Sequence, residues 1–264
     1  MFNREKLTRG QRWAIADQLA ADRLPEIDAA LDNIVPSRTL YSQYGKRVLD
    51  IALSGAALVV TLPINAAIGV GTLVDVGRPI LFKQSRTGRH GVPFTLVKFR
   101  NMRNTVDERG ELLPASQRVT KFGKFVRKTS LDELLNFVSV FKGDMSLIGP
   151  RPLPLEYEHR YTKRHRARLE VRPGLECPPR FFDRQWTWQE QFENDVWYVE
   201  NLSFKTDCMM AVNLVRYALS PKSSAARGAA KRGIFMGYDL DGTAITLEEV
   251  PQEYIDAVAE GEDS

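Results

Sequence analysis

A block of 24 residues without a charged side chain constrains this chain more than any other feature. It runs from Ile51 to Val74, and Asn65 is its most polar residue. As a straight helix it would reach about 36 Å, more than the roughly 30 Å hydrocarbon core of a bilayer. Because a soluble core helix is seldom this long without a charge, the block predicts a membrane segment.

Two features of this block disfavour a simple crossing. Pro63 lies near its middle, where it removes a helical hydrogen bond and clashes with the preceding turn. Both flanks are basic, and short basic flanks prefer the cytoplasmic side of a membrane. A re-entrant hairpin broken at Pro63 keeps both flanks on that side, although a spanning helix and a soluble core helix remain alternatives. The flanking basic residues are Arg38, Lys46, Arg47, Arg78, Lys83, Arg86 and Arg89.

The composition excludes several other classes of protein. The 43% of hydrophobic residues exclude a disordered chain. The mean hydropathy of −0.30 excludes a protein with many membrane spans. The net charge of +4 is modest, so the clustering of charge matters more than its total. Cys177 and Cys208 form no CxxC pair, which favours a reduced cytosolic setting, and no signal peptide is expected at the N-terminus.

Periodicity and turn residues predict the remaining elements. An amphipathic surface helix is expected from about Gln11 to Leu31, with Pro36 ending it. Two strands are expected at 80–84 and 93–99, around a turn at Gly88 and Gly91. Further helices are expected as a broken pair over 121–142, one very basic helix over 155–170, and one or two over 187–219. The tail begins with a linker-like stretch and ends acidic, and its Asp-Gly sequence at 241–242 predicts a turn.

The segment KTSLDELLNFV (128–138) carries two adjacent carboxylates. Ser130 followed three residues later by Glu133 matches a capping box, in which Asp132 and Glu133 would merely complement the helix dipole. Alternatively, the two acids form a nucleophile and metal-binding pair. A carboxylate can attack phosphorus, and the phosphate charge must then be neutralised by cations and metal. The spacing alone leaves both interpretations open.

Cations that suit the second interpretation are close in sequence. Arg151 lies in GPRP (149–152), where prolines fix the backbone, and arginine binds phosphate in a bidentate manner. Lys98 and Arg100 end the second predicted strand. The other basic residues nearby are Lys121, Lys124, Arg127 and Lys128.

From about Tyr44 to Leu219 the sequence resembles the bacterial sugar transferase family, the monotopic polyprenyl-phosphate phosphoglycosyl transferases. The resemblance is carried by KRVLDIALS (46–54), PILFKQSRTGRHGVPFTLVKFRNM (79–102), VTKFGKFVRKTSLDELLNFVSVFKGDMSLIGPRPL (119–153), RPG (172–174) and FENDVWYVENLSFKTD (192–207). The long central block is highly specific.

The resemblance implies a reaction and roles for particular residues. Asp132 attacks the β-phosphate of a UDP-sugar and releases UMP, and the phosphosugar passes to a polyprenyl phosphate, normally undecaprenyl phosphate. Asp132 also contacts Mg²⁺, and Glu133 assists in positioning or metal binding. The residues expected to hold phosphates or substrate are Lys98, Arg127, Arg151 and Arg184.

The expected fold is α+β and mostly helical. It has a re-entrant membrane helix over 48–75 broken at Pro63, a small β-hairpin, and amphipathic helices on the membrane surface. The transferase domain is expected at 46–220, with extensions at 1–45 and 221–264 that have no assigned function. The protein is expected at the cytoplasmic (inner) membrane of a bacterium with its site facing the cytosol. Its partners are expected to be the membrane, a UDP-sugar and undecaprenyl phosphate, with no nucleic acid.

Two departures from the family pattern affect these expectations. Leu62 precedes Pro63 where the family often has serine, and residues 175–180 replace a Thr-Gly-Trp-Ala-Gln-like run. The aromatic residues Trp186, Trp188, Trp197 and Tyr198 suit a membrane interface or a protein core equally well. Two alternatives to an active enzyme stay open: a non-catalytic module that binds anionic lipid or nucleic acid through residues 155–170, and an inactive partner of another transferase.

Overall fold

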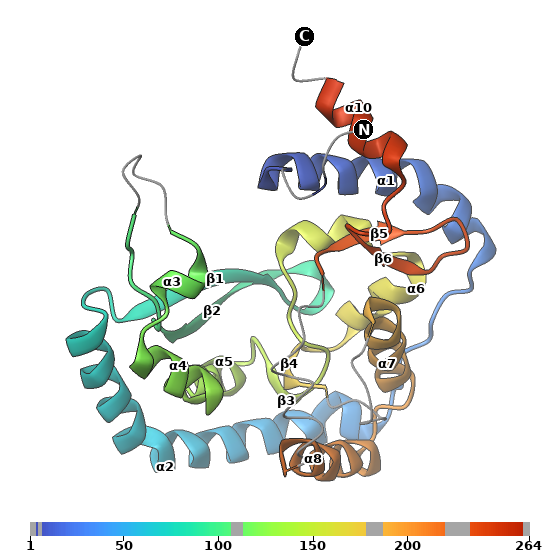
Figure 1. The fold of residues 1–264 in the computed structure, drawn as a ribbon. Helices are drawn as coiled ribbons and strands as arrows, with labels where there is room; N and C mark the ends of the chain where they lie inside the picture. Colours follow the sequence, from blue (N-terminus) through green and yellow to red (C-terminus); the bar gives the residue numbers. More distant parts are fainter. Residues whose placement is uncertain (1–3, 5–6, 107–112, 178–186, 220–232, 261–264) are drawn as a thin grey trace.

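A computed structural model describes residue 4 and residues 7–106, 113–177, 187–219 and 233–260. Helices and small two-stranded sheets make up the fold, which agrees with the expected α+β class (Figure 1). The helices are α1 (Arg9–Ala30), α2 (Lys46–Asp75), α3 (Ala115–Arg118), α4 (Lys121–Lys128), α5 (Asn136–Lys142), α6 (Lys163–Arg166), α7 (Trp188–Glu200), α8 (Phe204–Leu219) and α10 (Gln252–Glu260). Short turns of other helix types are η2 (Tyr41–Gly45), η3 (Arg89–Gly91), η4 (Leu131–Glu133), η5 (Leu155–Arg160) and η6 (Ala167–Glu170).

The strands form three separate pairs. β1 (Leu81–Thr87) and β2 (Pro93–Phe99) are antiparallel, with Leu81 opposite Phe99, and they confirm the predicted hairpin. β3 (Ser146–Ile148) and β4 (Gly174–Glu176) are parallel. β5 (Phe235–Tyr238) and β6 (Ala244–Thr246) form a second hairpin in the C-terminal extension, where the sequence predicted only the turn.

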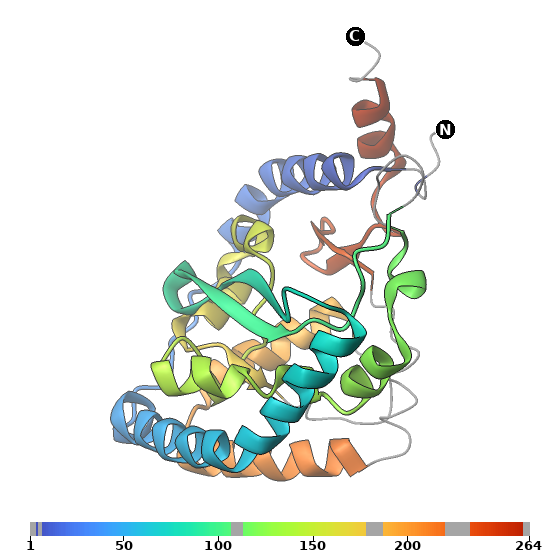
Figure 2. The ribbon, with the colours of Figure 1, turned by 90° about the vertical axis from the view of Figure 1, so that its left-hand side faces the viewer.

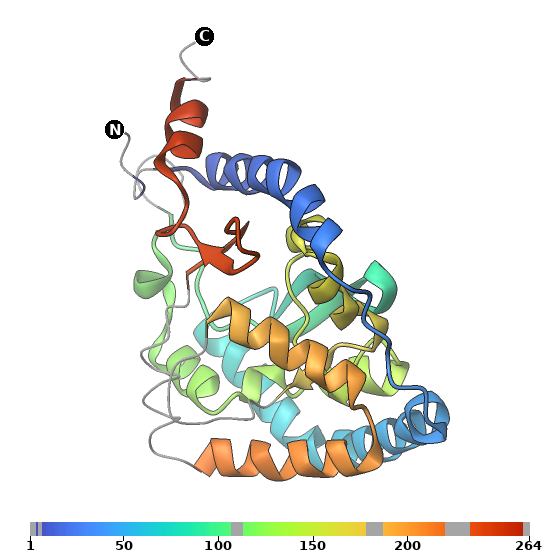
Figure 3. The ribbon, with the colours of Figure 1, turned by 90° about the vertical axis from the view of Figure 1, so that its right-hand side faces the viewer.

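The helices lie on two sides of the molecule. Helices α2 and α8 lie along one side, and α4, α5 and the β1–β2 hairpin lie above them (Figures 1 and 2). Helices α1 and α10 and the β5–β6 hairpin lie on the opposite side (Figure 3). The helices α1 and α10 of the two extensions are therefore far from α2 (Figure 3).

Helix α2 continues through Pro63 and is not interrupted by a loop. Its axis bends between its two halves (Figures 1 and 2), as proline commonly causes in a long helix. Close to the proline, Thr61 Oγ1 donates to the Ala57 carbonyl at 2.7 Å, and Asn65 Nδ2 donates to Thr61 Oγ1 at 3.2 Å. The predicted break is thus a bend within one continuous helix.

The N-terminal end of α2 is held against the body of the protein. The buried Asp50 carboxylate accepts hydrogen bonds from Ser146 Oγ and the Leu147 backbone N–H, both at 3.0 Å. Arg47 donates to the carbonyls of Val140 and Phe141 at 2.6 and 2.8 Å. These contacts connect the start of α2 to β3 and to the end of α5.

The C-terminal end of α2 is held by the same body. Arg100 donates to the carbonyls of Val76 and Gly77 at 2.6 and 3.0 Å, and Thr120 Oγ1 donates to the Asp75 carboxylate. A β-carbon on Gly71 would lie 2.5 Å from the tip of the Phe122 ring, so a larger residue there would require Phe122 to shift. Both ends of the apolar helix therefore return to one polar body.

One carboxylate joins α8 to the segment that leads into α2. Asp207 of α8 accepts hydrogen bonds from Tyr41 Oη, Lys46 Nζ and Tyr198 Oη, each at 2.6 Å. Tyr198 Oη also contacts the Ile148 carbonyl at 3.1 Å. Tyr198 and Trp188 are buried, so they belong to the core, while Trp186 lies outside the described residues.

The two extensions form a joint core with the rest of the chain. Thr8 caps α1 in a capping box with Gln11, and Ile15 and Leu19 of α1 pack against Met236 of β5 and Ile255 of α10. Helix α1 ends at Ala30, close to the expected end at about Leu31. A second cluster connects both extensions to the segment between β3 and α7; its buried members include Ile27, Phe235, Tyr238, Tyr157, Tyr161 and Phe192.

The prediction of one basic helix over 155–170 is wrong. The segment forms η5, α6 and η6, and three of its arginines pair with acids elsewhere in the protein. Arg160 pairs with Asp17 at 2.7 Å, Arg164 with Glu193 at 2.7 Å, and Arg168 with Asp195 at 2.9 Å. Because these cations hold the fold together, the segment offers little free charge to an external polyanion, which weakens the binding-module alternative.

The aromatic cluster predicts that the C-terminal hairpin stabilises the whole protein. Phe235→Ala removes a fully buried ring that contacts Tyr157, Trp188 and Phe192, and should lower the free energy of unfolding by about 3–5 kcal/mol. Denaturant unfolding of the full chain in detergent measures this change. Leu240→Ala, at a residue that is 75% exposed, is the control and should change stability by about 0.5 kcal/mol or less. Equal losses in the two variants would contradict the packing described.

The Arg164–Glu193 pair predicts a loss of stability in acid. Burial raises the pKa of Glu193, but hydrogen bonds from Arg164 and His165 outweigh it and lower the pKa from 4.5 to about 2. The unfolded chain therefore takes up this proton first, and the contribution of Glu193 is lost as the pH falls from about 4.5 towards 2. Glu193→Gln should flatten the pH dependence of thermal unfolding in this window, whereas Glu200→Gln, exposed on the same helix, should leave it unchanged.

Candidate active site

The loop after β2 lies directly against α4. A β-carbon on Gly123 of α4 would lie 2.1 Å from the Asn101 carbonyl oxygen, so any other residue would push the two segments apart. Thr120 caps α4 by accepting the Gly123 N–H at 2.8 Å. This packing places the Asn101 side chain beside the end of α4, where the Asp-Glu pair follows.

The two adjacent acids occupy the short turn η4 between α4 and α5. Ser130 has a left-handed backbone, with φ of 55°, and its side chain forms no cap hydrogen bond. The predicted capping box is therefore wrong, because Ser130 precedes η4 without bonding its side chain to that turn. Its carbonyl accepts the Glu133 N–H at 3.2 Å. The predicted break between two helices is correct.

Asp132 lies deep in the site. It is 5% exposed, and Asn101 Nδ2 donates to its Oδ2 at 2.9 Å. Burial, and then the Glu133 carboxylate, raise the pKa of Asp132, whereas Lys98 and Arg127 oppose this rise. The carboxylate is therefore desolvated, Asn101 holds one of its oxygens, and two of the predicted cations act on its charge.

Arg151 lies between three carboxylates. Its Nη2 is 3.5 Å from Glu133 Oε1, and its Nη1 is 3.4 Å from Glu176 Oε2. Its side chain stays 48% exposed. Partial burial lowers its pKa, but Glu176, Glu133 and Asp132 outweigh it and raise the pKa of Arg151. The guanidinium is thus permanently charged and accessible beside Asp132.

Close backbone contact fixes the GPRP loop that carries Arg151. A β-carbon on Gly174 of β4 would lie 2.1 Å from Gly149 N, so the two glycines permit β3 and β4 to approach at the start of this loop. The Gly174 N–H donates to the Pro150 carbonyl at 2.9 Å. The loop therefore has little freedom to move.

A buried ion pair supports the same loop from behind. Arg168 donates through Nε to Asp195 at 3.0 Å and through Nη2 to the Arg151 carbonyl at 2.8 Å. Its Nη1 donates to Tyr161 Oη at 3.1 Å. Arg168 and Asp195 are almost completely buried. Arg168 thus acts on the site through the Arg151 backbone.

The structure brings most of the predicted site residues together. Glu133, Lys98 and Arg127 act on the charge of Asp132, Arg151 lies 3.5 Å from Glu133, and Arg184 lies outside the described residues. Arg100 is directed elsewhere, because it caps the end of α2.

The sequence reasoning missed Asn101 and Glu176, both of which contact site residues. Glu176 falls in the stretch that departs from the family pattern, and this departure was the available signal. Nothing comparable marked Asn101, since its contact depends on the approach permitted by Gly123.

Comparisons with known proteins agree with this geometry. Residues 41–220 match the family model described as bacterial sugar transferase. The uncharacterized sugar transferase EpsL of Bacillus subtilis is 42% identical over 175 residues, which are 66% of this chain and 87% of that protein.

Two further relatives have longer chains. The undecaprenyl-phosphate galactose phosphotransferase of Salmonella typhimurium is 32% identical over 205 residues, which are 67% of this chain and 41% of that protein. The UDP-glucose:undecaprenyl-phosphate glucose-1-phosphate transferase of Escherichia coli is 35% identical over 136 residues, 49% of this chain and 29% of that protein. The chain spans less than half the length of these two relatives.

The family match covers α2, the Asp-Glu turn, the GPRP loop and α8, which together form the site and its apolar side. The chain thus belongs to the bacterial sugar transferase family, as the sequence predicted, and its enzyme class is phosphoglycosyl transferase.

Proposed function

We propose that this protein transfers a sugar 1-phosphate from a UDP-sugar to undecaprenyl phosphate through a covalent bond to Asp132. The observation that carries the proposal is the state of Asp132. It is a buried carboxylate, oriented by Asn101 and faced by Lys98 and Arg127. The Salmonella and Escherichia coli relatives are named as enzymes that act on undecaprenyl phosphate, which supports the same acceptor.

In the first step, an Asp132 oxygen attacks the β-phosphorus of the UDP-sugar. The bond between this phosphorus and the oxygen that bridges to the α-phosphate breaks, and UMP leaves with that oxygen and its electron pair. Asn101 donates to Oδ2 and so orients the carboxylate for this attack. Burial removes the water that would stabilise the carboxylate, which makes it a better nucleophile.

In the second step, a phosphate oxygen of undecaprenyl phosphate attacks the same phosphorus. The bond to Asp132 breaks, the carboxylate is restored, and the product is undecaprenyl-diphospho-sugar. Negative charge accumulates on the phosphoryl oxygens in both steps. Lys98, Arg127 and the accessible guanidinium of Arg151 are close to Asp132 and supply the positive charge that stabilises it.

Mg²⁺ is part of the proposal. Magnesium is commonly bound by one or two carboxylates together with substrate phosphates and water. Asp132 and Glu133 supply two adjacent carboxylates, and within the described ranges no three acidic, histidine or cysteine side chains gather into a larger ligand set. The donor chemistry therefore fits a magnesium ion shared with phosphate, whose positive charge would offset that of the two acids.

We also propose that α2 enters the cytoplasmic leaflet, bends at Pro63 and returns to the same side. Among the described residues, Tyr41–Asp75 is the one helix apolar and long enough to cross a membrane. Crossing would carry part of the polar body into the bilayer, because both ends of the helix bind that body. The exposed apolar residues on neighbouring helices extend the surface of α2: Phe125, Phe141, Phe204, Val212 and Val215.

Replacement of the nucleophile tests the mechanism. Asp132→Asn should reduce UMP release by about 10³-fold or more, because the amide cannot form the phosphosugar bond. Wild-type protein mixed with the correct UDP-sugar and no acceptor should gain the mass of one sugar phosphate, and the variant should not. The donor is found by screening UDP-sugars with undecaprenyl phosphate.

The Asp241→Asn variant is a matched control. It makes the same chemical change in the exposed Asp-Gly turn between β5 and β6, where Asp241 accepts the Thr243 N–H at 2.9 Å. This variant should keep wild-type turnover. Product formed by Asp132→Asn at the wild-type rate, or by wild type without any adduct, would refute the covalent mechanism.

The buried contact behind Arg151 predicts a positioning role for Arg168. Arg168→Lys keeps the charge but loses the fork that bridges Asp195 and the Arg151 carbonyl, and should lower kcat by about 10- to 100-fold. Tyr161→Phe removes one partner of Arg168 and leaves that bridge, so it should stay near wild type. Steady-state kinetics, corrected for folded fraction, measure both, and equal kcat values in the two variants would contradict this role.

The membrane arrangement predicts the accessibility of the two flanks. Leu40→Cys and Arg78→Cys, in a chain with Cys177 and Cys208 replaced by serine, should resist an impermeant maleimide in intact spheroplasts. Both should react after the membrane is permeabilised, because both flanks face the cytosol. Labelling of one position alone in intact spheroplasts would instead indicate a helix that crosses.

A further inference from the structure

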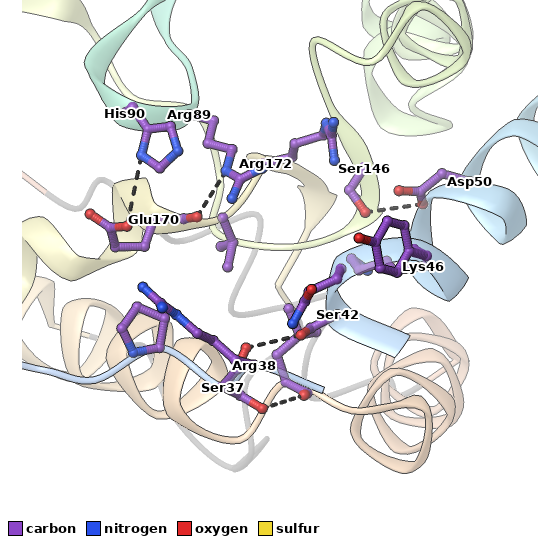
Figure 4. Close-up of a pocket in the computed structure, with 15 residues that line it drawn as sticks. Ser37, Arg38, Ser42, Lys46, Asp50, Arg89, His90, Ser146, Glu170 and Arg172 are labelled. Carbon is purple, nitrogen blue, oxygen red and sulfur yellow. Dashed lines mark hydrogen bonds and ion pairs between the residues drawn. The ribbon is translucent and has the colours of Figure 1, made fainter. Parts of the chain in front are cut away.

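A second basic site lies away from Asp132. A hollow of about 510 Å³ opens between the segment before α2, the β1–β2 turn and the residues after η6 (Figure 4). Among the described residues that line it are Arg38, Arg89, His90 and Arg172, and none of the residues proposed for catalysis is among them. The hollow is therefore separate from the Asp132 site.

Two of the arginines are fixed but not neutralised. Arg89 Nε donates to the Glu170 carbonyl and Arg172 Nε donates to the Gly143 carbonyl, both at 3.0 Å. Within the described part of the chain, their terminal guanidinium nitrogens form no hydrogen bond or ion pair, and neither does Arg38. Three guanidinium groups thus border one hollow and have N–H donors that are available to a ligand.

The acidic side chains that line the hollow already contact other residues of the protein. Asp50 accepts two hydrogen bonds from β3, and Glu170 lies 3.7 Å from His90. Lys46 is paired with Asp207 at 2.6 Å, so it adds little free charge. Burial, and then repulsion from Arg89 and Arg47, lower the pKa of Arg172. A bound anion would offset this surplus positive charge and reduce the repulsion between the arginines.

The position of the hollow indicates the kind of anion. Its rim includes Tyr44, which is 68% exposed and precedes the exposed Val48 at the start of α2. Leu40, also exposed, lies on the same segment. If the phosphate of a ligand lay in the hollow, the rest of that ligand could extend to the apolar surface of α2. Arginine forks match phosphate oxygens, and anionic headgroups lie where the basic flanks meet the membrane.

We propose that this hollow binds the phosphate of an anionic phospholipid headgroup, at a site distinct from the one that handles the substrates. Binding there would hold the N-terminal end of α2 at the membrane surface. The inference does not depend on the proposed reaction, because it concerns different residues and is tested by binding alone.

Native mass spectrometry of the full chain in detergent tests the proposal. Wild-type protein should retain phosphatidylglycerol in preference to phosphatidylcholine. The double variant Arg38→Gln/Arg89→Gln changes two exposed residues, so it should still fold. It should retain at least about tenfold less phosphatidylglycerol than the wild type. Arg78→Gln is the matched control, because Arg78 is exposed beside the other end of α2 and does not line the hollow.

The outcomes separate the sources of phosphate. Phosphatidylglycerol retained by wild type and Arg78→Gln but lost by the double variant supports a lipid site. Equal retention of both lipids, combined with inorganic phosphate that stabilises wild type but not the double variant against heat, supports a phosphate site filled from solution. Equal losses in the double variant and Arg78→Gln, or no loss in either, would overturn the proposal. Circular dichroism spectra confirm that each variant is folded.

Discussion

The attachment of both ends of one apolar helix to a single polar body is the constraint on which the rest of this structure depends. Asp50 and Arg47 hold the first end to β3 and α5, while Arg100 and Thr120 hold the second. In the proposed membrane arrangement, this attachment keeps both ends of the helix on one side of the bilayer. It would also hold the body, with α4, α5 and the Asp-Glu turn, at the membrane surface.

The site balances opposed charges within a rigid frame. Asp132 is desolvated and repelled by Glu133, yet the charges of Lys98, Arg127 and Arg151 act on it favourably. These three cations come from different elements, and glycine contacts at Gly123 and Gly174 bring those elements together. Precise placement is thus achieved with backbone contacts and one buried ion pair, so few side chains need to move when substrate charge arrives.

Sequence reasoning could predict the elements whose signals are local. The β1–β2 hairpin, the interrupted helix over 121–142 and the family followed from turns, periodicity and motifs. It failed where distant residues decide the outcome. The segment 155–170 looked like one helix, but buried pairing of Arg160 and Arg168 with acids elsewhere in the chain divides it. Ser130 matched a capping box, yet its backbone is left-handed and its side chain forms no cap hydrogen bond. The contact of Asn101 with Asp132 likewise had no local signal.

Three hydrogen bonds to Asp207 couple helix α8 to the start of α2 and to α7. Tyr41 and Lys46 from the start of the apolar helix, and Tyr198 from α7, all reach this one carboxylate on α8. Detaching α8 would leave the buried Lys46 ammonium and the Tyr41 phenol without this partner and would remove one of the two contacts of Tyr198, so these contacts are lost together. In the membrane arrangement proposed above, α2 and α8 would therefore dock on the bilayer as one cooperative unit.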